Sequence, residues 1–246
     1  MVNIIYKNKY METLKKPSFF VLAAVLACTN LQAQTADEIV SKYIAAIGGK
    51  SAIENTKTLY IESDVDYAGN TLSSTTWIVN GKGYKSEVDF SGTKILNCVS
   101  DKGGWTVNPM MGATTPTPIP DEQLKSLKGQ MNVGGPLYDY AAKGSKIELI
   151  GQDSADYKIK LTGSGVGSTF FINKKTYYID KSIATISMQG TDFETTLTFS
   201  DYRKLDNGFV FGFSQTVVNP QATVNVVHKK VEVNKAIDPA IFDMPK

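Results

Sequence analysis

The chain has 246 residues, 42% of them hydrophobic and 20% charged, so its composition favours a packed globular core and excludes a disordered chain. The formal charge of +2 comes from the N-terminus, because residues 34–246 hold 22 basic and 23 acidic residues. Arg203 is the single arginine, and without a basic surface we expect no nucleic-acid partner.

The first 33 residues have the pattern of a signal peptide. Lys15 and Lys16 precede an apolar stretch over residues 17–27 that is too short to span a bilayer, and Ala33 fits cleavage before residue 34. We therefore expect an exported, periplasmic protein whose residues 34–246 form a single domain. The run that ends at Cys28 also resembles a lipobox, so a membrane-anchored lipoprotein is the alternative.

Residues 35–48 are predicted to form an amphipathic helix. Thr35 and Glu38 make a capping box, apolar residues then recur at helical spacing, and Gly48-Gly49 ends the helix. From Leu59 the hydrophobic period changes to two, which predicts about five antiparallel strands over residues 59–108, with a hairpin turn at residues 80–81.

Residues 108–144 interrupt the strand pattern. Four prolines at positions 109, 116, 118 and 120 predict a loop, and Asp121 begins a predicted helix. Leu124, Leu127 and Met131 form the apolar stripe of that helix, and glycines at 134 and 135 break it. An apolar segment between two groups of strands predicts a lid or plug over a concave surface.

Strands resume at Ile147 and continue to Val233. Their links are short, so neighbouring strands are expected to pair, which predicts an antiparallel and strongly curved sheet. The sequence thus predicts a mostly β, α+β fold in which short helices cover or plug the concave face.

The sequence contains no catalytic motif, and we expect neither an enzyme nor a cofactor. Cys98 and His228 are the only cysteine and histidine after residue 33, so a metal site is not expected. A lone Cys in a strand is usually a buried apolar residue, and a lone His in a strand lies at a rim or in the core. A Cys98–His228 dyad is the competing interpretation, and sequence alone leaves it open.

A family resemblance comes from three stretches. These are residues 36–49, the run from Gly104-Trp105 to Asn108-Pro109, and the closing residues 237–245. They resemble outer-membrane lipoprotein-sorting proteins of the LolA/LppX-like superfamily, in the form common in Bacteroidetes. The resemblance implies an unclosed β-barrel of about eleven strands around short helices, and a periplasmic carrier of lipoprotein acyl chains or another lipid. It also implies a membrane-bound donor or acceptor protein as a partner.

The leading hypothesis is therefore a carrier that binds acyl chains by apolar burial in the hollow of a half-barrel. The expected ligand contacts are lid residues together with two tryptophans near the rim: Met110, Met111, Leu124, Leu127, Met131, Trp77 and Trp105. The alternative is a periplasmic structural or interaction module whose barrel is permanently filled by its helices.

Overall fold

The computed structural model describes residues 34–163, 167–188 and 191–245. Internal contacts divide the chain into two units, Met1–Gln34 and Thr35–Lys246, and every described helix and strand belongs to the second. The predicted signal peptide and Cys28 within it lie outside the described residues. None of the described helices is long and apolar enough to cross a membrane.

Two short helices begin the second unit, α1 (Ala36–Ala46) and α2 (Gly49–Asn55). Thr35 Oγ1 accepts a hydrogen bond from the Glu38 amide, and the Glu38 carboxylate accepts one from the Thr35 amide, so the predicted capping box is confirmed. Gly48 has a φ of +111°, and a Cβ there would lie 2.5 Å from the carbonyl oxygen of Gly208. Glycine at this position therefore allows both the turn and the close approach of the two loops.

Within the described residues, thirteen strands form one antiparallel sheet. The first group is β1 (Thr58–Tyr67), β2 (Asn70–Val79), β3 (Gly83–Phe90), β4 (Thr93–Ser100), β5 (Gly103–Asn108) and β6 (Ala113–Pro118). The second group is β7 (Lys146–Gln152), β8 (Asp156–Thr162), β9 (Ser168–Asn173), β10 (Ile179–Met188), β11 (Thr191–Lys204), β12 (Val210–Val218) and β13 (Thr223–Val233).

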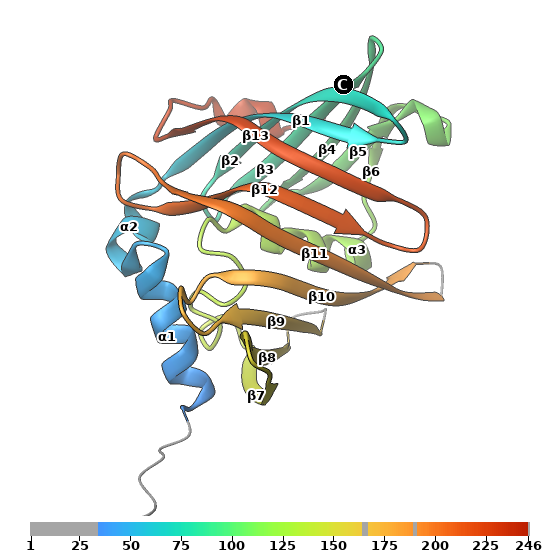
Figure 1. The fold of residues 1–246 in the computed structure, drawn as a ribbon. Coiled ribbons are helices and arrows are strands. Elements are labelled where there is room, and N and C mark those ends of the chain that lie inside the picture. Colours follow the sequence, from blue (N-terminus) through green and yellow to red (C-terminus); the bar gives the residue numbers. More distant parts are fainter. Residues whose placement is uncertain (1–33, 164–166, 189–190, 246) are drawn as a thin grey trace, which may run out of the picture. The chain divides into compact units, whose positions relative to one another are not determined.

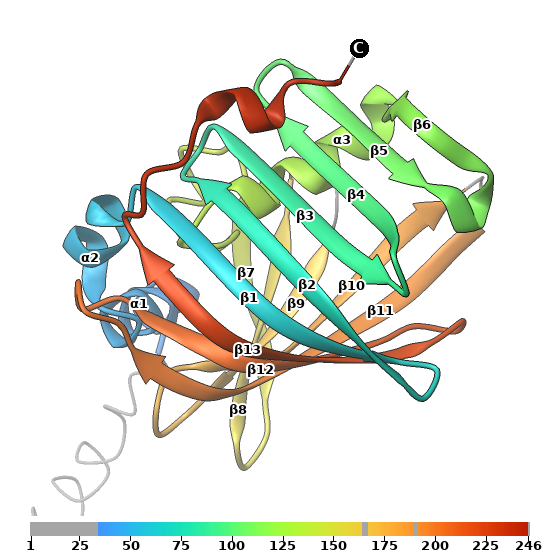
Figure 2. The same cartoon turned by 90° about the horizontal axis from the view of Figure 1, so that it is seen from above.

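Within each group, strands that follow one another in sequence are neighbours in the sheet. The two groups meet where β1 pairs with β13, with Leu59 opposite Val233. The sheet curls around an inner face and stays open, because β6 and β7 are its two edges (Figures 1 and 2). The predicted unclosed antiparallel barrel is confirmed, with two more strands than the resemblance implies.

The strand β6 differs from the prediction of a proline-rich loop. Residues 109–111 form a single 3₁₀ turn, η1 (Pro109–Met111), but Ala113–Pro118 pairs with β5. Pro116 and Pro118 have no backbone N–H to donate. A central strand needs such donors because it hydrogen-bonds with a neighbour on each side. The two prolines are tolerated because β6 is an edge strand with β5 as its single neighbour.

The chain between β6 and β7 forms α3 (Asp121–Leu127) and then η2 (Lys128–Met131), so the predicted helix after Pro120 is confirmed. The last described turn, η3 (Pro239–Phe242), lies on the outer side of the curled sheet (Figure 2).

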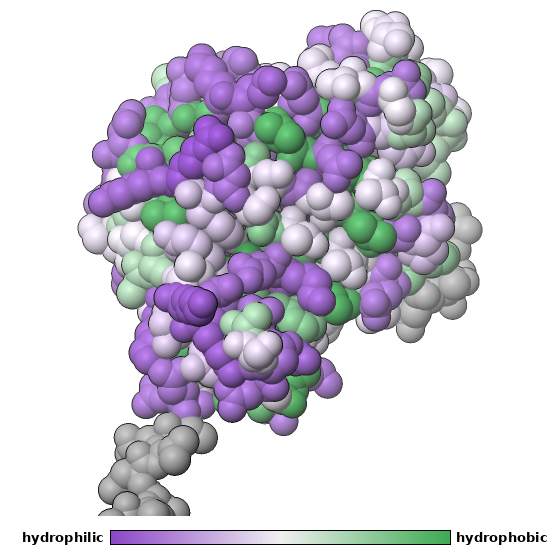
Figure 3. All heavy atoms as spheres, viewed as in Figure 1, coloured by the Kyte–Doolittle hydropathy of each residue, from purple (hydrophilic) through white to green (hydrophobic). Residues whose placement is uncertain are grey.

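Buried apolar residues gather in three clusters. The largest joins α1 and α2 to strands of both groups and includes Ile39, Ile53, Leu59 and Ile159. The second consists of Val99, Ile119, Leu124 and Met131, and the third of Cys98, Trp105 and Phe242. The face seen in Figure 3 is mostly hydrophilic, with hydrophobic residues in small separate patches.

Candidate functional site

Strand register defines the inner face of the sheet. Leu59, Ile78, Tyr84, Val99 and Gly104 lie opposite one another across β1–β5. Val99 packs against Leu124 of α3 and Met131 of η2, so this row faces the helical segment. Because alternate residues of a strand share a face, every second residue from this row also faces inward.

Residues 119–133 form what we call the cover segment. One end is fixed to β5 by a hydrogen bond from the Ile119 amide to the Gly104 carbonyl, 2.9 Å long. The other end is fixed to the β2–β3 turn, where the Gly81 amide donates to the Met131 carbonyl at 2.8 Å. Between these points the apolar side chains of Leu124 and Leu127 hold the segment against the sheet. The cover segment is thus a strap that is fixed at both ends.

Gly104 sets how closely the strap approaches the sheet. A Cβ at this position would lie 2.5 Å from Leu124 Cδ2 and 2.9 Å from the carbonyl oxygen of Cys98. The missing side chain therefore makes room for Leu124, which is 7% exposed.

Beyond the cover segment, the inner face carries apolar residues that join none of the three core clusters. They lie on β13, β1, β2, β3 and β4, and we call them the open inner section: Val226, Val65, Leu72, Val88 and Ile95. Val65 lies opposite both Val226 and Leu72, and Val88 lies opposite Ile95. Four of the five are half-buried rather than buried. These five apolar side chains thus face inward outside the three clusters, and Leu72 is the one of them that is buried.

The predicted lid residues fall into two places. Leu124 and Met131 are buried under the cover segment, and Leu127 is partly buried beside them. Met110 and Met111 lie on η1, directly after β5, and are 59% and 80% exposed. Because Leu96 lies opposite Val107, η1 lies at the end of β5 that is nearest Ile95 of the open inner section.

The two tryptophans are not at the rim. Trp77 lies opposite Tyr60 and Lys85, and Trp105 lies opposite Cys98, on the convex face of the sheet. The Trp77 and Tyr60 rings meet edge to face with centroids 6.0 Å apart, and Lys85 Nζ lies within 6 Å of both indole rings.

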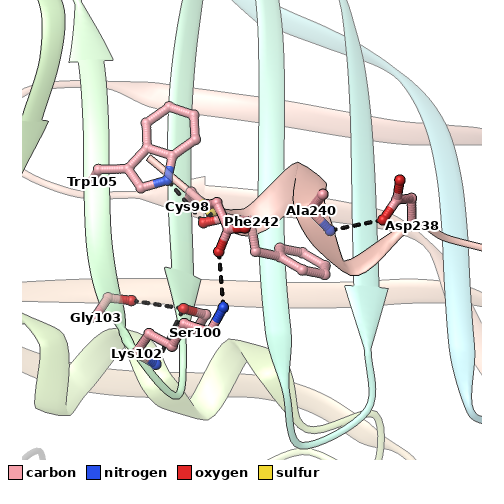
Figure 4. A network of polar contacts seen from close by, with 9 residues as sticks. Cys98, Ser100, Lys102, Gly103, Trp105, Asp238, Ala240 and Phe242 are labelled. Atoms are coloured by element: carbon pink, nitrogen blue, oxygen red, sulfur yellow. Dashed lines mark hydrogen bonds and ion pairs between the residues drawn. The ribbon is translucent and has the colours of Figure 1, made fainter. Parts of the chain in front are cut away.

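Figure 4 shows how the C-terminal segment covers Trp105. The indole Nε1–H donates to the Phe242 carbonyl oxygen at 3.0 Å, and Cys98 Sγ lies 3.3 Å from the same oxygen. Cys98 is fully buried, as predicted, and burial raises the pKa of its thiol to about 11. This environment therefore disfavours the thiolate form, which is the reactive form of a cysteine nucleophile.

His228 faces the other way. It lies opposite Ser63 on the inner face, and its Nδ1 is 2.8 Å from Ser63 Oγ. Since Cys98 lies on the convex face, the Cys98–His228 dyad does not form. Burial lowers the pKa of His228 to about 4, so the imidazole is neutral at physiological pH.

The sequence patterns did not predict the contact between Ser63 and His228. Its only sequence signal is that Ser63 interrupts the apolar alternation of Ile61 and Val65, and that His228 does the same after Val226. Recognising the pair requires knowing that the first and last strands are neighbours.

Of two cavities among the described residues, one borders the cover segment and the other lies apart from it. One of about 370 Å³ lies between the ends of β4 and β5, the start of α3 and residues 242–244, with the ion pair of Lys102 and Asp243 in its wall. One of about 210 Å³ lies between α1 and residues 137–140. Neither is lined by the open inner section. Among the described residues, no three His, Cys, Asp or Glu side chains are grouped so that they could hold a metal ion.

No protein-family model and no curated protein matches the chain. Solved structures with a similar fold include the following three. A LolA superfamily protein from Nitrosomonas europaea has a TM-score of 0.57 at 12% identity, covering 86% of this chain and 98% of that one. A domain from Vibrio parahaemolyticus assigned to outer membrane lipoprotein sorting has a TM-score of 0.52 at 15% identity, covering 84% and 95%. A DUF1329 family protein from Desulfovibrio piger has a TM-score of 0.58 at 13% identity, covering 86% and 98%.

Proposed function

We propose, on the premise that residues 35–246 have a LolA-like fold, that this protein is a lipid carrier. It binds lipoprotein acyl chains, or another lipid, without catalysing a reaction. The observation that carries the proposal is the open inner section, whose apolar residues face inward yet join no core cluster. An acyl chain laid along them gains about 0.8 kcal/mol for each methylene that leaves water.

The cover segment supports this reading. The backbone hydrogen bonds at the two ends of the cover segment leave its middle held by side-chain packing, so in this proposal the middle moves outward while the ends stay in place. Movement of Leu124 away from Val99 would then extend the open inner section under α3. Met131 and Leu127 would contact the cargo from the strap, and Met110 and Met111 from the rim, where flexible thioethers adapt to varied apolar partners. Trp77 and Trp105 are not part of this proposed site, because they face the convex side.

The cellular setting belongs to the same proposal. The signal pattern of residues 1–33 supports export to the periplasm, either as a soluble protein or anchored through Cys28. One of the structures with this fold is a domain assigned to outer membrane lipoprotein sorting. A carrier of this kind would receive or deliver its cargo at a membrane-bound donor or acceptor protein.

A second candidate has an observation in its favour. Leu124 and Met131 are each 7% exposed and Leu137 is 1% exposed, so the segment between β6 and β7 already fills part of the inner face. In a structural or interaction module this filling would be permanent, and no lipid would enter.

Native mass spectrometry of the protein purified from periplasm without detergent separates the two candidates. A carrier retains an extra mass that extracts into organic solvent as lipid. A clean protein mass that stays unchanged after incubation with fluorescent acyl probes would instead identify the filled module.

A matched pair of variants tests the assignment of the strap. Leu127→Asp places a charge beneath the cover segment and is expected to abolish binding of the acyl probe. Ile150→Asp adds the same charge at an exposed position on β7 and should bind like the wild type. Equal binding by the two variants would remove Leu127 from the site.

A further inference from the structure

A hydrogen-bonded pair of polar side chains, Ser63 and His228, lies in the inner face at the border of the covered and open parts. Ser63 is two residues from Ile61, which belongs to the main core, and two residues from Val65 of the open inner section. Ser63 itself is 6% exposed, and its hydroxyl is 2.8 Å from Nδ1 of His228. An acyl chain along the open inner section would therefore lie beside this pair.

The imidazole is held in place from two sides. The Phe211 ring lies 5.3 Å from it, centroid to centroid, and the Ser63 hydroxyl fixes Nδ1. No described residue hydrogen-bonds Nε2, and His228 is not among the side chains with a fully buried and unpartnered nitrogen or oxygen. Nε2 therefore remains accessible at the inner face. In the tautomer whose Nδ1 accepts from the Ser63 hydroxyl, the neutral ring carries its proton on Nε2 and offers one donor there.

Among the described residues, two cations near the pair in the sheet are already paired with acids. Lys229 pairs with Asp64 at 2.8 Å, and Arg203, which stacks on Phe213 at 4.4 Å, pairs with Asp201 at 2.5 Å. A carboxylate brought to this place would lose its hydration without gaining an opposite charge, which is costly. A neutral carbonyl oxygen needs only the one donor.

We propose that the Ser63–His228 pair is the recognition point for the carbonyl oxygen of an acyl ester, with Nε2–H of His228 as the donor. The inference rests on the proposed carrier function and adds the chemical class of its cargo: acyl chains in ester linkage to glycerol, rather than free fatty acids.

The pair is arranged for binding rather than for acyl transfer. Serine hydrolases bind the serine through one ring nitrogen and a carboxylate through the other, which orients and supports the base. Here the serine occupies Nδ1, and no described carboxylate binds Nε2. The depressed pKa also makes the ring a weak proton acceptor.

Two glycerolipids that differ only in the carbonyl test the proposal. Displacement of a fluorescent acyl probe is measured with 1-monolauroylglycerol, an ester, and with 1-O-dodecylglycerol, its ether analogue. The wild type should prefer the ester by about three- to tenfold, as expected for one neutral hydrogen bond. His228→Phe keeps the ring contact with Phe211 and should bind both lipids equally. His228→Gln retains a donor and should keep part of the preference.

Equal affinity of the wild type for ester and ether would overturn the recognition point while leaving the carrier function intact. Failure of both lipids and of the probe to bind would overturn the carrier function itself. Lauric acid is the third ligand, and binding as tight as that of the ester would overturn the assignment to esters.

If His228→Phe fails to fold, Ser63→Ala replaces it. Without the hydroxyl the proton is no longer held on Nε2, so the preference for the ester should fall. An unchanged preference in Ser63→Ala contradicts the proposed role of the pair. A diacylglyceryl-cysteine peptide and free diacylglycerol, both esters, then show whether the cargo is a lipoprotein or a glycerolipid.

Discussion

Gly104 is the position where a single methyl group should loosen the cover segment. In Gly104→Ala the new Cβ would lie 2.9 Å from the Cys98 carbonyl oxygen and 2.5 Å from Leu124 Cδ2. The leucine methyl can rotate away, but the carbonyl belongs to the backbone of β4 and cannot move without disturbing the sheet. Overpacking of this kind costs about 1–3 kcal/mol of unfolding free energy.

Urea unfolding followed by circular dichroism measures this loss. Gly129→Ala is the control, because a Cβ there meets nothing within 4 Å. Its unfolding free energy should be unchanged or slightly raised, since alanine restricts the unfolded chain more than glycine does.

A double mutant tests whether the loss of stability comes from packing against the cover segment. Leu124→Ala alone should cost about 2–5 kcal/mol as a buried large-to-small change. Combined with Gly104→Ala it should cost less than the sum of the two, because the alanine at 104 then partly fills the space that Leu124 leaves. Wild-type stability of Gly104→Ala, together with strict additivity in the double mutant, would refute the packing of α3 against β5.

Two further predictions concern titratable groups. Burial lowers the pKa of His228 to about 4 in the folded protein, so the unfolded chain binds the extra proton first as the pH falls below about 6.5. The histidine's contribution to stability is therefore complete above pH 6.5 and is lost toward pH 4. Between pH 8 and pH 5 the wild type should lose about 2 kcal/mol more unfolding free energy than His228→Gln, and parallel pH profiles would disprove this. The second prediction concerns Cys98, which lies under Phe242 and should react slowly with maleimide in the wild type. Phe242→Ala should speed the reaction at least about tenfold by giving reagent and solvent access to the thiol, and an unchanged rate would mean that the C-terminal segment does not protect it.

Local patterns predicted the elements that depend on neighbours in sequence. The capping box at Thr35 located α1, and the alternation after Leu59 located β1 and β2. The acidic residues directly after Pro120 predicted helix α3. In each case the signal and the structure it determines lie within a few residues.

Features that depend on distant strands were not predictable in this way. The run Ile95–Val99 is apolar on both faces, so sequence could not tell that Val99 faces the cover segment while Cys98 faces the C-terminal segment. The same ambiguity affects Trp105, which was expected near the rim and lies opposite Cys98 on the convex face. The Ser63–His228 contact joins residues 165 positions apart and exists only because β1 pairs with β13.

The junction of β1 with β13 has a consequence for how the chain folds. Each meander consists of strands joined by short links, and before the two meet each exposes an edge that the complete sheet pairs, β1 in the first and β13 in the second. The two edges meet only after Val233 has become available to pair with Leu59. Contacts of such sequence separation form slowly, and open edges attract other chains meanwhile. The completed sheet is therefore a late event, and a chain cut short before β13 would leave the β1 edge open to aggregation.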